Sequence, residues 1–98
     1  MQDNFEVTKI IDGNTFEVKP FWEWEDENGV LVRPTGYNAP GVGEPGYQEV
    51  KNQLMELLFG EKVMLKHAVA IVDDALICEV HIDGKNLAEY FPPIRNNR

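Results

Sequence analysis

Serine is absent from this chain of 98 residues, and Cys78 is its single cysteine. A serine nucleophile, an internal disulfide and a metal site built on several thiolates are therefore excluded. Cys78 alternates with apolar neighbours and is expected in the core. No apolar run is long enough to cross a membrane, and residues 1–4 show no signal peptide. We expect a cytoplasmic location by default, or a secreted or envelope location if a signal segment precedes this sequence.

Positive charge is scarce as well. Nine Lys and Arg stand against 17 Asp and Glu, which gives a net charge of −8. This is the wrong sign for a protein that holds nucleic acid through many phosphate contacts. Acidic residues are densest over residues 23–27, which we interpret as a solvated hairpin tip. The charge balance favours a protein or a small ligand over nucleic acid as the partner.

Alternation of apolar and polar residues predicts five strands, bounded by turn signals rich in Gly, Asp and Asn. The predicted strands are residues 5–11, 15–24, 30–36, 62–70 and 75–83, with turns at 12–13, 26–29 and 73–74. A period of two along each strand implies that one face of the sheet is buried. The pattern therefore predicts a protein built mainly from antiparallel hairpins.

The main helix is predicted over residues 46–59, where apolar side chains recur on one stripe and Gly60 supplies a stop signal. Residues 86–91 are expected to form a short second helix, which the prolines at 92–93 end. Three strands, a helix, two strands and a short helix are typical of an OB-type barrel. We therefore expect one domain over residues 1–98, in the α+β class but mainly β. We expect this domain to be a small five-stranded OB-type Greek-key barrel with one main helix and a short C-terminal helix.

Several short segments follow one another in a characteristic order. They are Asp12-Gly13-Asn14-Thr15, Val32-Arg33, Gly36, Ala39-Pro40, residues 46–49, Gly60 and Asp83-Gly84-Lys85. In order and spacing they resemble the signature segments of the thermonuclease, or staphylococcal nuclease-like, family. The resemblance covers nearly the whole chain and implies the same OB-type barrel. It also implies a relationship to enzymes that cleave DNA and RNA with Ca²⁺.

The resemblance places the family's catalytic positions on residues of different chemistry. The two aspartates that bind Ca²⁺ fall at Asn14 and Asn38, and the backbone carbonyl ligand falls at Ala39. The glutamate proposed to activate water falls at Gly41. Ca²⁺ is a hard ion that prefers anionic oxygens, so amides in place of carboxylates weaken its attraction.

One phosphate-binding arginine of the family is retained as Arg33, whereas the position of the other falls at Ala75. The alternative role for Arg33 is an ion pair with a glutamate of the neighbouring strand. The joint loss of carboxylates and an arginine leads to a hypothesis. We expect a nuclease-like domain that lacks Ca²⁺-dependent phosphodiesterase activity and acts as a binding or interaction module. No cofactor is expected, and the partner is an unknown protein or a single-stranded nucleic acid.

The residues expected to contact such a ligand are Arg33, Tyr37 and Asn38. The alternative function is an active nuclease that hydrolyses DNA or RNA phosphodiesters at a rearranged site, with Ca²⁺ bound. The residues of that site are Asp12, Asn14, Asn38 and Ala39 for the metal and Arg33 and Glu44 for catalysis. Ca²⁺ is expected only in this alternative.

Aromatic and imidazole side chains offer two further candidate sites. Phe21, Trp22 and Trp24 could form a stacking platform for single-stranded bases, as in many OB folds. Because glutamates adjoin them, we instead expect one tryptophan to plug the barrel and the other to cover the hairpin. His67 and His81 lie on different predicted strands without a third ligand at metal spacing, so we expect strand surface residues rather than zinc ligands.

Overall fold

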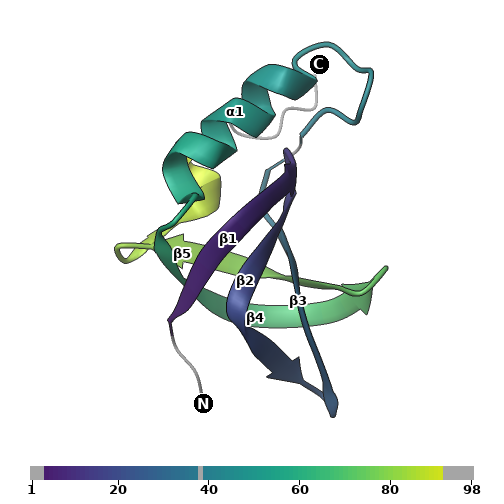
Figure 1. Ribbon diagram of the computed structural model, residues 1–98, viewed down its shortest axis with the longest axis vertical. Coiled ribbons are helices and arrows are strands. Elements are labelled where there is room, and N and C mark those ends of the chain that lie inside the picture. Colours follow the sequence, from purple (N-terminus) through teal and green to yellow (C-terminus); the bar gives the residue numbers. More distant parts are fainter. Residues whose placement is uncertain (1–3, 38, 92–98) are drawn as a thin grey trace.

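The structure is a computed structural model that describes residues 4–37 and 39–91. It is a small β-barrel with one α-helix and one short 3₁₀ helix (Figure 1). The elements are β1 (Phe5–Asp12), β2 (Thr15–Trp24), β3 (Glu27–Pro34), α1 (Tyr47–Leu58), β4 (Lys62–Val72), β5 (Ala75–Ile82), β6 (Lys85–Asn86) and the 3₁₀ helix η1 (Leu87–Tyr90). Neither helix of these residues has the length and apolar character needed to cross a membrane. The predicted fold class, α+β and mainly β, is confirmed.

Five strands close the barrel in the order β3-β2-β1-β4-β5. Neighbours in this order are antiparallel, and β3 returns to β5 as a parallel pair in which Leu31 lies opposite Ala75 and Pro34 opposite Cys78. This last pairing joins the two ends of the sheet, whereas β1 and β4 pair only where Phe5 lies opposite Val63 and Glu6 opposite Lys62. The architecture is compatible with an OB-like fold.

The core follows the alternation of the strands. In β5, Leu76, Cys78, Val80 and Ile82 are all buried. Burial, followed by the negative charge of Glu79, raises the pKa of the Cys78 thiol to about 12. The thiol therefore stays protonated and packs as a small apolar side chain. The predicted core position of Cys78 is confirmed.

Helix α1 covers one end of the barrel (Figure 1). Leu54 and Leu58 have no solvent exposure and supply the apolar stripe that faces the strands. The tip of the β1–β2 hairpin reaches this end. A Cβ on Gly13 would lie 3.0 Å from Ala39 Cβ and 3.2 Å from Val50 Cγ1, so only glycine fits there without a shift. The β2–β3 hairpin marks the opposite end of the barrel.

The β2–β3 hairpin is tighter than its sequence pattern predicts. Its turn lies on Glu25 and Asp26, whose φ angles are 52° and 68°. Two successive residues in the left-handed region match the twist of the flanking strands in a two-residue hairpin. β3 therefore begins at Glu27, and the turn predicted over residues 26–29 was wrong.

The C-terminal part also departs from prediction. β4 ends at Val72, two residues beyond the predicted strand, and contains a bulge at which His67 has a φ of 54°. The two residues of β6 pair with β5, and the helix that follows is a single 3₁₀ turn. Asn86 Oδ1 caps that turn by accepting a hydrogen bond from the Ala88 N–H at 2.9 Å. The predicted helix stop and frayed tail, over residues 92–98, lie outside the described residues.

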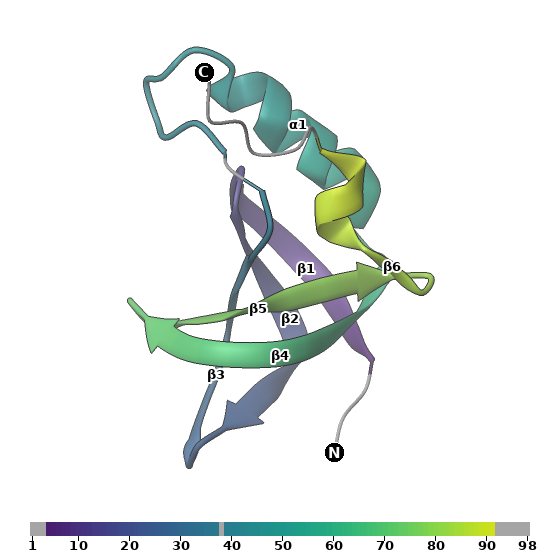
Figure 2. The same cartoon turned by 180° about the vertical axis from the view of Figure 1, so that it is seen from behind.

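The 3₁₀ turn η1 lies beside α1 (Figure 2). The Gln53 side chain of α1 donates a hydrogen bond to the Tyr90 carbonyl at 3.2 Å. Leu87, in the same turn, is fully buried. The end of the described chain is thereby attached to the helix that covers the barrel.

Candidate functional site

The β1–β2 turn holds the first position at which the resemblance places a metal ligand. Asp12 Oδ1 accepts a hydrogen bond from the Asn14 backbone N–H at 3.0 Å, which forms an Asx turn. Asn14 Oδ1 in turn accepts a hydrogen bond from the Thr15 hydroxyl at 3.3 Å. One oxygen of each side chain is thus engaged inside the turn.

Tyr37 is buried beneath this turn. Its hydroxyl donates a hydrogen bond to the Gly13 carbonyl at 3.0 Å, and its ring stacks on Phe91 with a centroid separation of 4.2 Å. Burial, and then the negative charge of Asp12, raise the pKa of Tyr37, so the hydroxyl keeps its proton and its role as a donor. A role for Tyr37 in ligand binding stays a prediction, and its hydroxyl already has a partner.

Arg33 lies near the end of β3, opposite Ile77 of β5. The residue is half-buried, and its Nε is buried without a hydrogen-bond partner. None of the ion pairs between described residues involves Arg33, so the predicted pair with a neighbouring glutamate is not formed. A buried donor without an acceptor costs free energy, and a bound anion would satisfy it.

The loop before α1 carries the remaining predicted site residues. Glu44 Oε1 accepts a hydrogen bond from the Gly41 N–H at 2.7 Å, and the Glu44 N–H donates to the Gly41 carbonyl at 3.0 Å. Glu44 therefore closes a turn of its own loop. Ala39 is half-buried and packs against Gly13. Asn38 lies outside the described residues.

The donor set does not fit Ca²⁺. This ion takes about six to eight oxygen ligands and favours carboxylates. The resemblance offers amides at Asn14 and Asn38, while Asp12 and Glu44 each use an oxygen to accept a backbone N–H. Across residues 4–37 and 39–91, no group of three or more His, Cys, Asp or Glu side chains is arranged to hold a metal ion.

The position of the second arginine is also unsuited to phosphate. Ala75 begins β5, is buried, and pairs with Leu31 and Val72 on the two neighbouring strands. A guanidinium there would have to leave the barrel wall or be desolvated. The region thus keeps one cation, Arg33, of the two that the resemblance implies.

A cluster on the outer face of β4 and β5 was missed by sequence reasoning. Glu79 Oε1 lies 3.0 Å from His81 Nε2 and 3.1 Å from His67 Nδ1. The hydrogen bond with His81, followed by that with His67, holds the pKa of Glu79 below its usual value. His67 is a surface residue, as predicted, but His81 is half-buried, and both share one carboxylate.

The sequence alone predicts one part of this cluster, the proximity of Glu79 and His81. Residues two apart on a strand share a face, so Glu79 and His81 were certain to be neighbours. The bulge between Lys66 and Ala70 brings His67 to them, and no turn residue marks that bulge in the sequence.

No protein-family model matches this chain, and no curated protein matches it. The barrel gives the site its position, but one fold serves many unrelated functions. Function is therefore inferred from the fold together with the hydrogen bonds and burial of the polar side chains at the site.

Proposed function

We propose that this chain is a nuclease-type barrel without a catalytic centre, which serves as a binding module. The observation that carries the proposal is the use of the acidic side chains. Asp12 and Glu44, the two carboxylates assigned to the alternative rearranged site, both accept hydrogen bonds from backbone N–H groups of their own turns. Phosphodiester hydrolysis needs cations that stabilise the charge of the transition state. The amides at Asn14 and Asn38 are poor ligands for such a cation.

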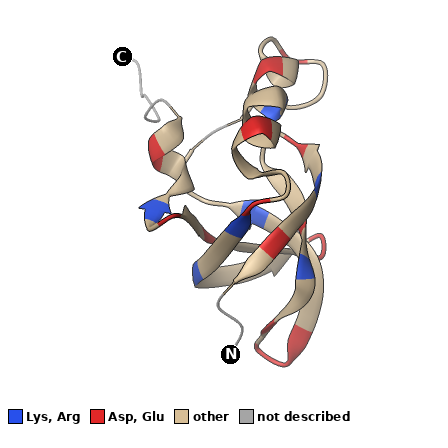
Figure 3. Ribbon diagram, turned by 60° about the vertical axis from the view of Figure 1, so that its left-hand side comes forward, with Lys and Arg blue, Asp and Glu red and all other residues tan. Residues whose placement is uncertain are grey.

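Charge supports a ligand other than a long nucleic acid. Each strand or helix of the described residues carries at most two Lys or Arg side chains, as Figure 3 illustrates for one side of the molecule. A single-stranded nucleic acid is normally held along a continuous basic groove. We propose instead a protein or small-molecule ligand that presents one carboxylate or phosphate to Arg33, whose buried Nε would gain an acceptor.

The second candidate function is hydrolysis at a rearranged site. The unpartnered Arg33 favours it, because an uncompensated guanidinium is also what a phosphoryl transition state requires. In this alternative Asp12 and Glu44 would each use their second carboxylate oxygen. The two functions differ in one measurable respect, which is chelator-sensitive cleavage.

The test is a fluorescently labelled single-stranded oligonucleotide, incubated with protein in about 10 mM Ca²⁺, roughly ten times the weakest dissociation constant of extracellular calcium sites. Anisotropy and denaturing gels are read together, with and without EDTA. We expect an intact oligonucleotide. Cleavage that EDTA abolishes, and that is lost in both Arg33→Gln and Asp12→Asn, would overturn the proposal and establish the alternative.

The anion contact is tested separately by NMR. The Arg33 side-chain Nε–H is observable in ¹H–¹⁵N spectra and is assigned with Arg33→Lys, from which its signal disappears. We expect inorganic phosphate to shift this resonance in a saturable way at constant ionic strength. A resonance that does not move would contradict a role for Arg33 in anion binding.

A further inference from the structure

A pocket of about 400 Å³ lies at the end of the barrel opposite α1. Its lining residues are Phe5, Phe21, Trp22, Glu23, Trp24, Leu65, His67, Ala68 and Leu76. β1 runs from this pocket, at Phe5, to the β1–β2 turn, at Asp12. At about 3.3 Å per residue the two ends of the strand are roughly 20 Å apart. The pocket is therefore separate from the β1–β2 turn, and Arg33 is not among its lining residues, so its role does not depend on the proposed function.

The back wall of the pocket is held rigidly. Trp22 is buried, and its indole N–H donates a hydrogen bond to the Leu31 carbonyl at 2.8 Å. Gly29 of β3 makes room for the ring, because a Cβ there would lie 2.8 Å from Trp22 Cζ2. The expectation that one tryptophan plugs the barrel is confirmed for Trp22. A wall fixed before binding lowers the entropic cost of holding a ligand.

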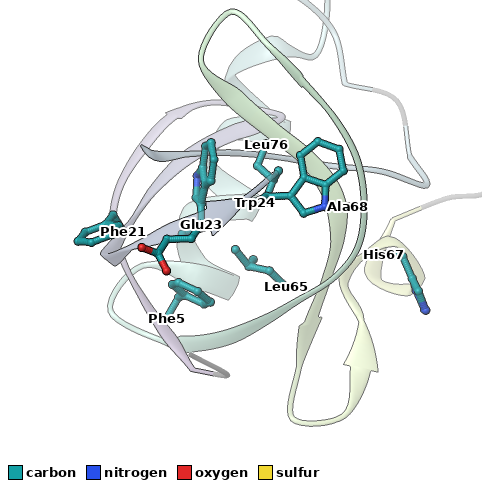
Figure 4. Close-up of a pocket in the computed structure, with 9 residues that line it drawn as sticks. Phe5, Phe21, Glu23, Trp24, Leu65, His67, Ala68 and Leu76 are labelled. Atoms are coloured by element: carbon teal, nitrogen blue, oxygen red, sulfur yellow. The ribbon is translucent and has the colours of Figure 1, made fainter. Parts of the chain in front are cut away.

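The open side is aromatic and carries one carboxylate. Figure 4 shows the Glu23 carboxylate directed toward the rings of Phe5 and Phe21, with Leu65 and Trp24 on the other side of the hollow. Phe21 is 50% exposed and forms the rim. His67 points away from the hollow in the same view, which agrees with its contact to Glu79 outside the barrel.

The charge of the pocket has one sign. Glu23 is the only Asp or Glu among the nine lining residues, and none of them is Lys or Arg. The adjoining turn adds Glu25, Asp26 and Glu27, and Figure 3 shows acidic ribbon at the tip of this hairpin. An anionic ligand would be repelled here. A neutral apolar ligand would remove water from the Glu23 carboxylate without replacing it by a partner.

Aromatic faces around a carboxylate are suited to an organic cation. A cation within about 6 Å of a ring centroid is attracted by the negative face of the ring, and Trp gives the strongest effect. A quaternary ammonium group combines that charge with methyl groups that also bury apolar surface. A volume of about 400 Å³ is in the range of small-molecule sites.

We propose that this pocket binds a small quaternary ammonium compound. The methylated head lies against Trp24 and Phe5, and its charge faces Glu23. The ring of Phe21 covers the head from the rim. The hairpin tip adds long-range attraction for cations, which salt screens.

Choline is the test ligand, and intrinsic fluorescence is the readout. The chain has two tryptophans, and both line the pocket, so their emission reports on this site directly. The matched control is 3,3-dimethylbutan-1-ol, which has the same shape as choline with carbon in place of the charged nitrogen. Sodium chloride at equal ionic strength controls for salt.

We expect a saturable change of emission with choline and at least about tenfold weaker binding of the neutral analogue, the ratio expected for a partly desolvated cation–π site. Equal binding of the two compounds would overturn the proposal, since the pocket would then select shape without charge. The absence of a saturable response to choline by about 10 mM would overturn it as well, since the affinity would then be weaker than that of ordinary small-molecule sites.

Two substitutions test which side chains of the pocket contribute to choline binding. Glu23→Gln should weaken choline binding about five- to tenfold, and Trp24→Leu should weaken it further while keeping apolar volume in the pocket. Glu23 is exposed, so its substitution leaves the core intact. Glu56→Gln removes an exposed carboxylate from α1, at the other end, and should bind like the parent. Unchanged binding by Glu23→Gln would contradict the assigned role of its charge.

Discussion

Two polar side chains in and just after β3 differ in their hydrogen bonding. The Tyr37 hydroxyl has an acceptor, the Gly13 carbonyl, whereas Arg33 Nε is buried without one. Leaving a buried donor unpaired costs about 1–3 kcal/mol, more when the group is charged. The folded chain carries this cost at Arg33 and would recover it on binding an anion. The same comparison indicates that Tyr37 serves the fold, because its hydroxyl is already satisfied.

The Tyr37 hydrogen bond should be measurable as stability. Tyr37→Phe removes the donor and leaves the Gly13 carbonyl without its partner. We expect a loss of about 1 kcal/mol in the free energy of unfolding, typical of a buried neutral hydrogen bond, measured by urea denaturation. Tyr90→Phe is the control, because the Tyr90 hydroxyl makes no hydrogen bond with any described residue. The ring of Tyr90, whose centroid lies 4.4 Å from Lys85 Nζ, is kept in this variant. Equal midpoints for the two variants would count against the Tyr37 bond.

At the scale of elements, the outer face of β4 and β5 should make stability depend on pH. The hydrogen bonds from His81 and His67 lower the pKa of Glu79 from its ordinary value of 4.5. A depressed carboxylate pKa stabilises the fold above the ordinary value, and this contribution is lost as pH falls through the folded value.

Glu79→Gln should therefore approach the parent in stability as the pH falls. We expect the parent to be more stable at pH 7 and the gap to narrow as the pH falls below the ordinary value of 4.5, where the carboxylate takes up its proton. Urea midpoints at several pH values give the two profiles. Glu56→Gln, on the exposed side of α1, should follow the parent throughout. Parallel profiles for the parent and Glu79→Gln would show that Glu79 titrates alike in the folded and unfolded chains.

The sequence predicted the existence of the strands and the main helix more accurately than the positions of the turns between strands. Asn28-Gly29 is the stronger local turn signal, yet both residues lie in β3. Packing explains the shift, because Gly29 is needed where the Trp22 ring crosses the strand. The turn moves to Glu25 and Asp26, which adopt positive φ at some local cost. Tertiary contacts thus override local turn chemistry at this hairpin.

At the scale of the whole molecule, the folding of the strands into a barrel creates two features that the sequence could not predict, an aromatic pocket and a shared contact of two histidines. The placement of Arg33 on the third strand follows from pattern alone. The aromatic pocket does not, because its walls come from β1, β2, β4 and β5, and no periodic signal links Phe5 to Leu76. The shared contact of His67 and His81 with Glu79 likewise depends on a bulge in one strand meeting the alternation of another.

The proposed origin of the barrel can be tested by restoring its carboxylates. The variant combines Asn14→Asp, Asn38→Asp and Gly41→Glu, the three positions at which the resemblance expects acidic side chains. Asp replaces Asn14 with the same shape, and a Cβ on Gly41 meets Glu44 Oε1 at 3.7 Å, an ordinary contact. With Asp12 nearby, the region would then offer the anionic oxygens that Ca²⁺ prefers.

We expect the triple variant to be less stable than the parent without Ca²⁺, because three added negative charges repel one another and Asp12. Millimolar Ca²⁺ should then raise its melting temperature, whereas Mg²⁺ should raise it less. A ligand at about ten times its dissociation constant stabilises a fold by about 1.4 kcal/mol, which is a shift of several degrees for a domain of this size. The parent should show no such shift.

The control must carry the same added charge elsewhere. Gln48→Glu, Asn52→Asp and Met55→Glu place three carboxylates on the exposed side of α1, and general screening by Ca²⁺ would affect them equally. A Ca²⁺ response confined to the first triple variant would mean that the loop and the β1–β2 turn converge as in a calcium-dependent nuclease. Equal responses would mean that they do not converge, and the barrel would then share with that family only its architecture.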